Sequence, residues 1–338
     1  MKFKCFTLTL ALTASLFYLP SANAETELKS GGSTFSANYI DRCRVMYAQQ
    51  GGGTLNYTAN GSGAGRNFFN NKLIDFAVTD TPYGSSDVKP KEEYLYLPLL
   101  AGPVAIVYNL PEYKVRLNLS NEVLAKIFAG QITMWNDPQI AKLNTGKLPK
   151  KRIVVVFRSD GSGTSEVFTS YLNAVAPTIW SKPGNKTFVS AFPGDINKFT
   201  GYFQSSNGAM QVAITGKMMP GTITYNEVSY VGTLKAALIE NEAGRFIAPT
   251  TLAASAFLSG LTFNQDGSAK LDYLNRSKSS YNISTFAYAL VYRNNGEKAA
   301  DIKMFLEFAL TKCNKIPNYA PITGNALKVA KSQLAKIG

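Results

Sequence analysis

Three turns rich in Gly, Ser and Thr carry the residues of this sequence that are best suited to chemistry. They are SGGSTFSANY (30–39), NGSGAGR (60–66) and RSDGSGTSEVF (158–168), and each lies where a helix is expected to begin. The start of a helix exposes unpaired N–H groups with a partial positive charge, and Gly lets the backbone approach a ligand closely. The turns therefore predict oxyanion binding. Further hydroxyl donors would be Thr34, Ser62, Ser162 and Thr164.

Two charged residues specify the anion further. Arg158 opens the third turn, and its planar guanidinium suits a tetrahedral oxyanion. Asp80, in IDFAVTDTP, has the opposite sign. If it faces the ligand it can only accept a hydrogen bond, so it would favour an anion that carries a proton, such as phosphate, and repel sulfate. Asp80 is also a typical turn residue, and Asp160 could either orient Arg158 or cap the following helix.

Most enzyme classes are disfavoured by composition. The chain has no His, which excludes Ser-His-Asp and Cys-His mechanisms and His-ligated zinc, and its 3 Cys are too few for a Cys₄ site. Each turn taken alone is also typical of an ordinary helix N-cap. A phosphate-ester hydrolase with Ser62 or Ser162 as nucleophile and Asp80 or Asp160 as base is an alternative. A binding protein without catalytic residues, metal or other cofactor is the favoured interpretation.

The N-terminus predicts export. Lys2 and Lys4 precede an apolar run of about 15 residues, too short to span a membrane, and Ala22-Asn23-Ala24 forms a cleavage site. Residues 1–24 are therefore expected to be a signal peptide, cleaved after Ala24, which places the mature chain in the periplasm or outside the cell. In that oxidising compartment the two remaining cysteines, Cys43 and Cys313, could form a disulfide or stay as buried thiols.

The net charge is strongly positive. The formal charge of +13 becomes +11 once Lys2 and Lys4 are removed with the signal peptide. Such a charge can attract anionic ligands or surfaces. The densest basic cluster, 150–152, has no interleaved aromatic residues, so a nucleic-acid groove is not expected.

The elements that would position the turns alternate between strands and helices, which indicates an α/β architecture. Ser120 is expected to cap a helix that stops at Gly130, and 180–208 is expected to form surface loops. Arg66 is expected on a solvated helix face, with attraction of the anion as the alternative. Expected strands or extended segments are 55–59, 74–78, 97–109, 153–157 and 286–292. Expected helices are those ending near 71, 120–128, 165–175 and 299–311.

These motifs resemble the PstS-type phosphate-binding proteins, the periplasmic receptors of phosphate ABC transporters. The correspondence runs in order across nearly all of the mature chain. Its matching segments are 31–35, 61–65, 75–82, 127–144, 158–165 and 220–225.

The resemblance implies a two-lobed periplasmic-binding-protein fold of type II with crossing hinge strands. One lobe would hold 25–107 plus 288–338 and the other 108–287. It implies a monomer that binds inorganic phosphate and delivers it to an inner-membrane permease; the alternative is a basic surface or interaction protein on the same scaffold. Asp160 would support Arg158. The implied phosphate ligands are Thr34, Phe35, Ser62, Asp80, Arg158, Ser162, Gly163 and Thr164.

Overall fold

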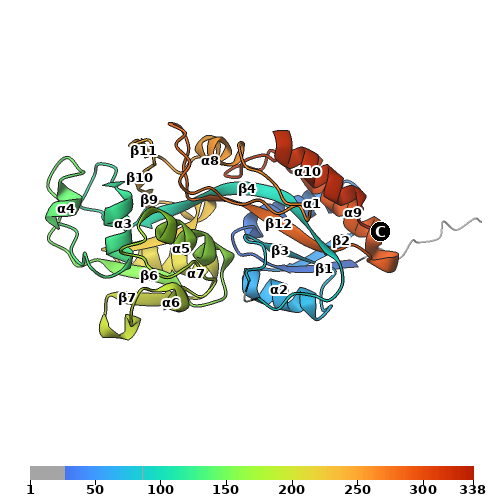
Figure 1. The fold of residues 1–338 in the computed structure, drawn as a ribbon, viewed down its shortest axis with the longest axis horizontal. Helices are drawn as coiled ribbons and strands as arrows, with labels where there is room; N and C mark the ends of the chain where they lie inside the picture. Colours follow the sequence, from blue (N-terminus) through green and yellow to red (C-terminus); the bar gives the residue numbers. More distant parts are fainter. Residues whose placement is uncertain (1–26, 86) are drawn as a thin grey trace, which may run out of the picture.

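The computed structural model describes residues 27–85 and 87–338, so the expected signal peptide at 1–24 lies outside the described residues. One mixed sheet runs through the whole molecule, in the order β2-β1-β3-β12-β4-β8-β6-β7 with β9 beside β4 (Figure 1). Its strands are β1 (Glu27–Gly32), β2 (Thr54–Thr58), β3 (Phe76–Thr79), β4 (Tyr94–Tyr108), β6 (Val154–Arg158), β7 (Phe203–Ser206), β8 (Thr222–Glu227), β9 (Lys235–Ala236) and β12 (Ser284–Tyr292). A small second sheet contains β5 (Asn118–Leu119), β10 (Leu238–Glu240) and β11 (Phe246–Ile247).

The long strand β4 joins two lobes. Residues 94–103 of β4 pair with β12, and residues 104–108 then pair with β8. Figure 1 shows β4 passing from the half that contains β1, β2 and β3 to the half that contains β6 and β7. Every residue of β4 after Tyr94 and every residue of β12 is buried. Such continuous apolar strands are typical of a sheet covered on both faces.

Helices cover both lobes. The first lobe carries α1 (Ala37–Gln49), α2 (Ser62–Asn70), η3 (Gly296–Lys298), α9 (Ala299–Thr311) and α10 (Gly324–Ala335). The second carries α3 (Asn121–Phe128), α4 (Pro138–Ala141), α5 (Gly163–Val175), α6 (Phe188–Ala191), η1 (Ile196–Lys198), α7 (Gly208–Met218) and η2 (Val228–Tyr230). α8 (Thr251–Leu258) packs on β4 and β12. The predicted α/β class is confirmed.

Local signals placed several helix starts correctly. The hydroxyl of Ser120 accepts a hydrogen bond from the backbone N–H of Val123 at 3.3 Å, as predicted for an N-cap. α5 begins at Gly163, two residues before the predicted start, because Ser162 is its N-cap and accepts from the N–H of Ser165 at 3.1 Å.

The prediction of surface loops over 180–208 was only partly right. This segment contains α6, η1 and β7, and four of its aromatic side chains are buried: Trp180, Phe188, Phe192 and Tyr202. These rings pack against each other and against Phe203 of β7. The abundant Gly, Asn and Lys of the segment lie between the rings in sequence, so composition alone did not reveal that these rings belong to the main hydrophobic core.

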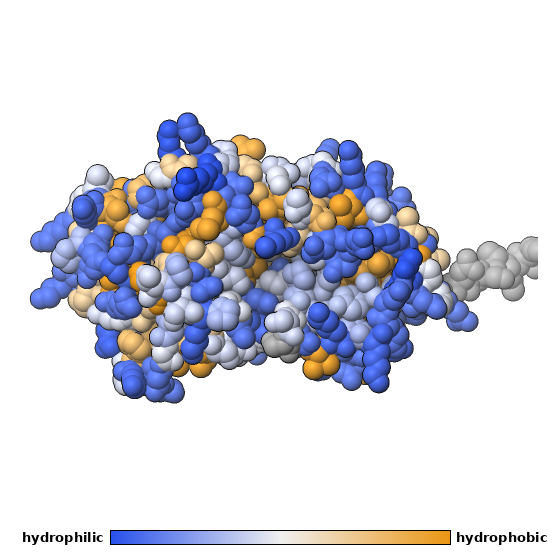
Figure 2. Space-filling view, in the orientation of Figure 1, coloured by the Kyte–Doolittle hydropathy of each residue, from blue (hydrophilic) through white to orange (hydrophobic). Residues whose placement is uncertain are grey.

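The outer surface is mostly polar. Figure 2 shows hydrophilic residues over most of one face, with apolar residues in small separate patches. Within 27–85 and 87–338, no helix has the length and apolar character needed to cross a membrane.

Cys43 of α1 and Cys313, just after α9, form a disulfide with a Cα–Cα distance of 5.5 Å. Both residues are fully buried. The bond closes a loop with a sequence separation of 270 residues, so it ties the N-terminal helix of the first lobe to the C-terminal part that returns to it.

Removing this crosslink should destabilise the fold. We expect a Cys43→Ala/Cys313→Ala variant to lose about 3–5 kcal/mol of unfolding free energy, because a long loop is released in the unfolded chain. Denaturant unfolding of the oxidised, reduced and variant proteins measures this, and the reduced protein separates loss of the bond from loss of the sulfur atoms. Equal midpoints for the oxidised and reduced proteins would contradict the expectation.

Candidate functional site

The three Gly-rich turns meet where the two lobes face each other. The N–H of Gly61 donates to the carbonyl of Gly32 at 2.7 Å, and the N–H of Gly63 donates to the carbonyl of Gly161 at 2.8 Å. Gly32 has φ of +127°, and a Cβ there would lie 2.2 Å from the Val78 carbonyl oxygen, so only Gly fits. Residues that are about 100 positions apart in the sequence therefore share one site.

Asp80 lies at the centre of these turns. It follows β3 directly and is 2% exposed. The hydroxyl of Ser33 donates to one of its carboxylate oxygens, and the hydroxyl of Thr164 donates to the other at 3.0 Å. Its backbone N–H donates to the hydroxyl of Ser62 at 3.3 Å. The carboxylate thus accepts from hydroxyl groups of the first and third turns, and the backbone N–H of the same residue binds the second turn.

Burial raises the pKa of Asp80 above its ordinary value. Its hydrogen bonds from Ser33 and Thr164, and the charges of Arg158 and Arg66, act in the opposite direction. A carboxylate held in this balance can face an anion only if that anion supplies a proton to the shared hydrogen bond.

Arg158 ends β6 with its guanidinium fixed by Asp160. The guanidinium Nε donates to Asp160 Oδ1 at 2.6 Å, and Nη2 donates to Oδ2. Both side chains are largely buried, at 3% and 11% exposure. Burial alone would raise the pKa of Asp160, but the hydrogen bonds and charge of Arg158 hold it below its ordinary value. Asp160 also accepts from the N–H of Gly208 at 3.0 Å, so it locks the cation to the start of α7.

The remaining predicted residues lie at helix starts around this pair. Ser62 is the first residue of α2, and Gly163 is the first residue of α5, where a Cβ would lie 2.6 Å from the Ser62 hydroxyl and 2.8 Å from Asp80 Cβ. The Thr34 hydroxyl accepts from the N–H of Ala209 at 3.3 Å, which links the first lobe to α7. The structure brings Ser62, Gly163 and Thr164 into contact with Asp80. Ser162, Thr34 and Phe35 lie in the same turns, but they make hydrogen bonds with Ser165, Ala209 and Tyr319, respectively.

Arg66 is buried, so the expectation of a solvated helix face was wrong. It is 2% exposed, and its guanidinium lies against Asp87, Glu166 and the carbonyl of Pro82. The sequence contained the signal. The buried residues of α2 are Ser62, Gly65, Arg66 and Phe69, a helical repeat that puts Arg66 on the face that begins with Ser62.

Glu227, at the end of β8, was missed by the sequence analysis. It is 1% exposed and accepts hydrogen bonds from the N–H and hydroxyl of Ser229 and from the Tyr319 hydroxyl. Its pKa is raised to about 7, chiefly by burial and also by the charge of Asp80, although these hydrogen bonds act in the opposite direction. Tyr319 also donates to the carbonyl of Phe35 at 3.3 Å, so Glu227 lies beside the first turn.

This carboxyl should make stability depend on pH. Between its ordinary pKa of 4.5 and its folded pKa of about 7, the folded protein keeps a proton that the unfolded chain has released. The free energy of unfolding therefore falls as pH rises through this window, by about 3 kcal/mol at most.

Denaturant unfolding at several pH values, for the wild type and a Glu227→Gln variant, measures the effect. We expect the wild-type slope across the window to be absent in Glu227→Gln and kept in Glu307→Gln, which changes an exposed glutamate of α9. Parallel curves for the wild type and Glu227→Gln would show that Glu227 titrates normally.

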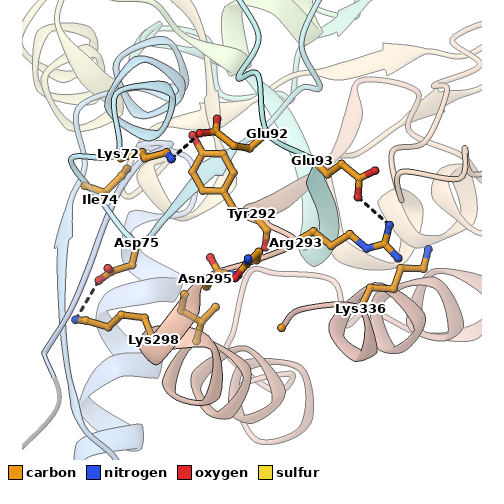
Figure 3. Close-up of a pocket in the computed structure, with 13 residues that line it drawn as sticks. Lys72, Ile74, Asp75, Glu92, Glu93, Tyr292, Arg293, Asn295, Lys298 and Lys336 are labelled. Carbon is orange, nitrogen blue, oxygen red and sulfur yellow. Dashed lines mark hydrogen bonds and ion pairs between the residues drawn. The ribbon is translucent and has the colours of Figure 1, made fainter.

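Another hollow lies at the opposite end of β3 from Asp80 (Figure 3). Its volume is about 990 Å³, and its charged side chains largely pair with one another. Lys72 pairs with Glu92, and Arg293 with Glu93, while Lys298 reaches Asp75 at 3.6 Å. Over the described ranges, no group of three or more acidic or Cys side chains is placed to hold a metal ion.

Comparison with known proteins agrees with this geometry. A family model described as the PBP superfamily domain matches residues 20–312. Phosphate-binding protein PstS 3 of Mycobacterium tuberculosis is 35% identical over 297 residues, which cover 83% of this chain and 77% of that protein. Phosphate-binding protein PstS of Haemophilus influenzae is 30% identical over 325 residues, which cover 93% of this chain and 94% of that protein. The chain belongs to the PstS family of phosphate-binding proteins.

Solved structures support the fold independently of the PstS sequence matches. A periplasmic phosphate-binding protein, PfluDING, crystallised with phosphate, aligns with a TM-score of 0.75 at 20% identity, over 91% of this chain and 93% of that chain. An ABC-type phosphate transport receptor from Vibrio cholerae aligns with a TM-score of 0.57 at 20% identity, over 87% of this chain and 99% of that chain. The predicted two-lobed periplasmic-binding-protein fold is confirmed.

Proposed function

We propose that this protein binds inorganic phosphate between its two lobes and delivers it to the permease of a phosphate ABC transporter. The observation that carries the proposal is the buried Asp80 carboxylate, surrounded by hydroxyl groups and helix starts and next to the fixed cation Arg158. The names of the PstS relatives support the same ligand.

The phosphate would be held from both lobes. Its donors would come from the first turn, from the start of α2 and from the start of α5, with Arg158 as the balancing cation and Asp80 as the acceptor of the phosphate proton. Asp160 would position Arg158. The proposed ligands are Thr34, Phe35, Ser62, Asp80, Arg158, Ser162, Gly163 and Thr164.

Export and domain division belong to the same proposal. The chain would be cleaved after Ala24 and act as a monomeric periplasmic receptor, not as an enzyme. Its first lobe would hold 25–107 plus 288–338, and its second 108–287. Both boundaries fall inside strands that run between the lobes, β4 and β12.

Calorimetric titration of the mature protein with phosphate, after unfolding and refolding to remove bound ligand, tests this function. We expect one site per chain. A folded protein that gives no binding heat and no phosphate-dependent rise in melting temperature would contradict the proposal.

A further inference from the structure

We propose that Arg66 is an interlobe latch: through Glu166 and Asp87 it holds the two lobes together and so slows phosphate release. This inference rests on the proposed function. It concerns residues outside the proposed phosphate shell.

The guanidinium of Arg66 is anchored in the first lobe. Its Nη1 donates to the carbonyl of Pro82 at 2.9 Å and lies 3.2 Å from a carboxylate oxygen of Asp87. It also lies over the ring of Tyr83, 5.6 Å from the ring centre. Three contacts from one loop therefore fix the direction in which the side chain points.

From this anchor Arg66 reaches the second lobe. Its Nη2 lies 3.2 Å from Oε2 of Glu166, in the first turn of α5, and the hydroxyl of Thr81 donates to the same oxygen at 2.7 Å. Glu166 comes two residues after Thr164, whose hydroxyl bonds Asp80. Figure 1 shows α2 and α5 in different lobes, so this contact exists only while the lobes are together.

A second ion pair also joins the two lobes. Lys186 of the second lobe pairs with Asp87, the first-lobe partner of Arg66, and its backbone carbonyl accepts from the N–H of Ser162. The side chains of Arg66, Asp87 and Glu166 are only 3%, 10% and 17% exposed. Ion pairs this sheltered are weakly screened, and removing one partner leaves a charge without compensation.

Arg66 has one hydrogen-bond donor without a partner, and its charge acts on Asp80 in the anion site. Arg66 Nε is buried and makes no hydrogen bond, so the guanidinium keeps one donor that its present partners do not use. Arg66 and Arg158 are the two cations whose charge acts on Asp80. Opening the lobes would break the Glu166 contact and, because Arg158 belongs to the second lobe, would also weaken the field that favours the ionised Asp80.

The test is the release of radiolabelled phosphate into excess unlabelled phosphate, measured by filter binding. The variants are Arg66→Met, Glu166→Gln and the double variant. We expect each single variant to release phosphate about tenfold faster, and the double variant to release it no faster than the faster single one, because both act on one contact. Arg293→Met removes a pair with Glu93 inside the first lobe and should leave release unchanged.

Thermal unfolding without phosphate separates a latch from a purely structural role. A latch that acts only between closed lobes predicts coupling between Arg66 and Glu166 in the release rate and none in the melting temperature of the phosphate-free protein. If Arg66→Met does not fold, Glu166→Gln decides, since Arg66 then keeps Asp87 as its partner. Wild-type release rates in Glu166→Gln would overturn the latch, whereas a wild type that retains no phosphate would overturn the proposed function instead.

Discussion

Replacing Arg158 with methionine is expected to weaken phosphate binding by about 10²- to 10³-fold or more, because removing one partner of a buried, hydrogen-bonded charge pair at a binding interface costs about 2–5 kcal/mol. The variant would leave Asp160 buried without its cation, beside Gly61 of the second turn and hence near the incoming anion. Two negative groups would then face a negative ligand. The affinity is measured by calorimetric titration with phosphate.

A matched control for this loss of charge is Arg152→Met. Arg152 precedes the same strand, β6, but is exposed and donates to the carbonyl of Thr200. The Arg152→Met variant should bind phosphate like the wild type, which would show that the position of the lost positive charge, and not the net charge, decides the affinity. An Arg158→Met/Asp160→Asn variant should recover part of the loss. Phosphate affinity in Arg158→Met equal to that in Arg152→Met would show that Arg158 is not a ligand.

Replacing Asp80 with asparagine is expected to remove most of the discrimination between phosphate and sulfate. The wild-type carboxylate would accept the proton of phosphate and repel sulfate, which has none to offer near neutral pH. An amide of nearly the same shape carries no charge and can also donate. Sites that recognise one polar group reject analogues without it by about 10⁴-fold, so we expect the ratio of the two affinities to fall by a large part of that factor.

Competition between the two anions measures this ratio directly. Sulfate should become a detectable competitor of phosphate in Asp80→Asn and stay silent in Asp195→Asn, which changes an exposed carboxylate at the start of η1. A variant that binds phosphate weakly and still ignores sulfate would indicate that Asp80 supports the turn and does not select the ligand.

The sequence was most informative where local chemistry decides structure. Turns of Gly, Ser and Thr before a helix follow from capping and from backbone conformations that favour Gly, so the starts of α3 and α5 could be predicted to within two residues. The negative charge of Asp80 among these turns was enough to predict an anion that carries a proton.

The sequence was least informative where distant segments create an environment. Glu227 is buried by Tyr319, which lies 92 positions away, and nothing near Glu227 in the sequence indicates this. The change of partner along β4 from β12 to β8 depends on strands far apart in the chain. Arg66 is intermediate, since the helical repeat from Ser62 predicts its face, but its two carboxylate partners are set by tertiary structure.

The central claim is that one phosphate is held at the three turns, with Asp80 as its acceptor and Arg158 as its cation. A crystal structure of the mature protein grown with phosphate tests this claim most directly. We predict one tetrahedral anion between the lobes, with an oxygen within hydrogen-bonding distance of the Asp80 carboxylate and others on the Arg158 guanidinium and the N–H of Gly163. An anion bound instead in the hollow lined by Lys72, Arg293, Lys298 and Lys336, with the three turns unchanged, would contradict the account.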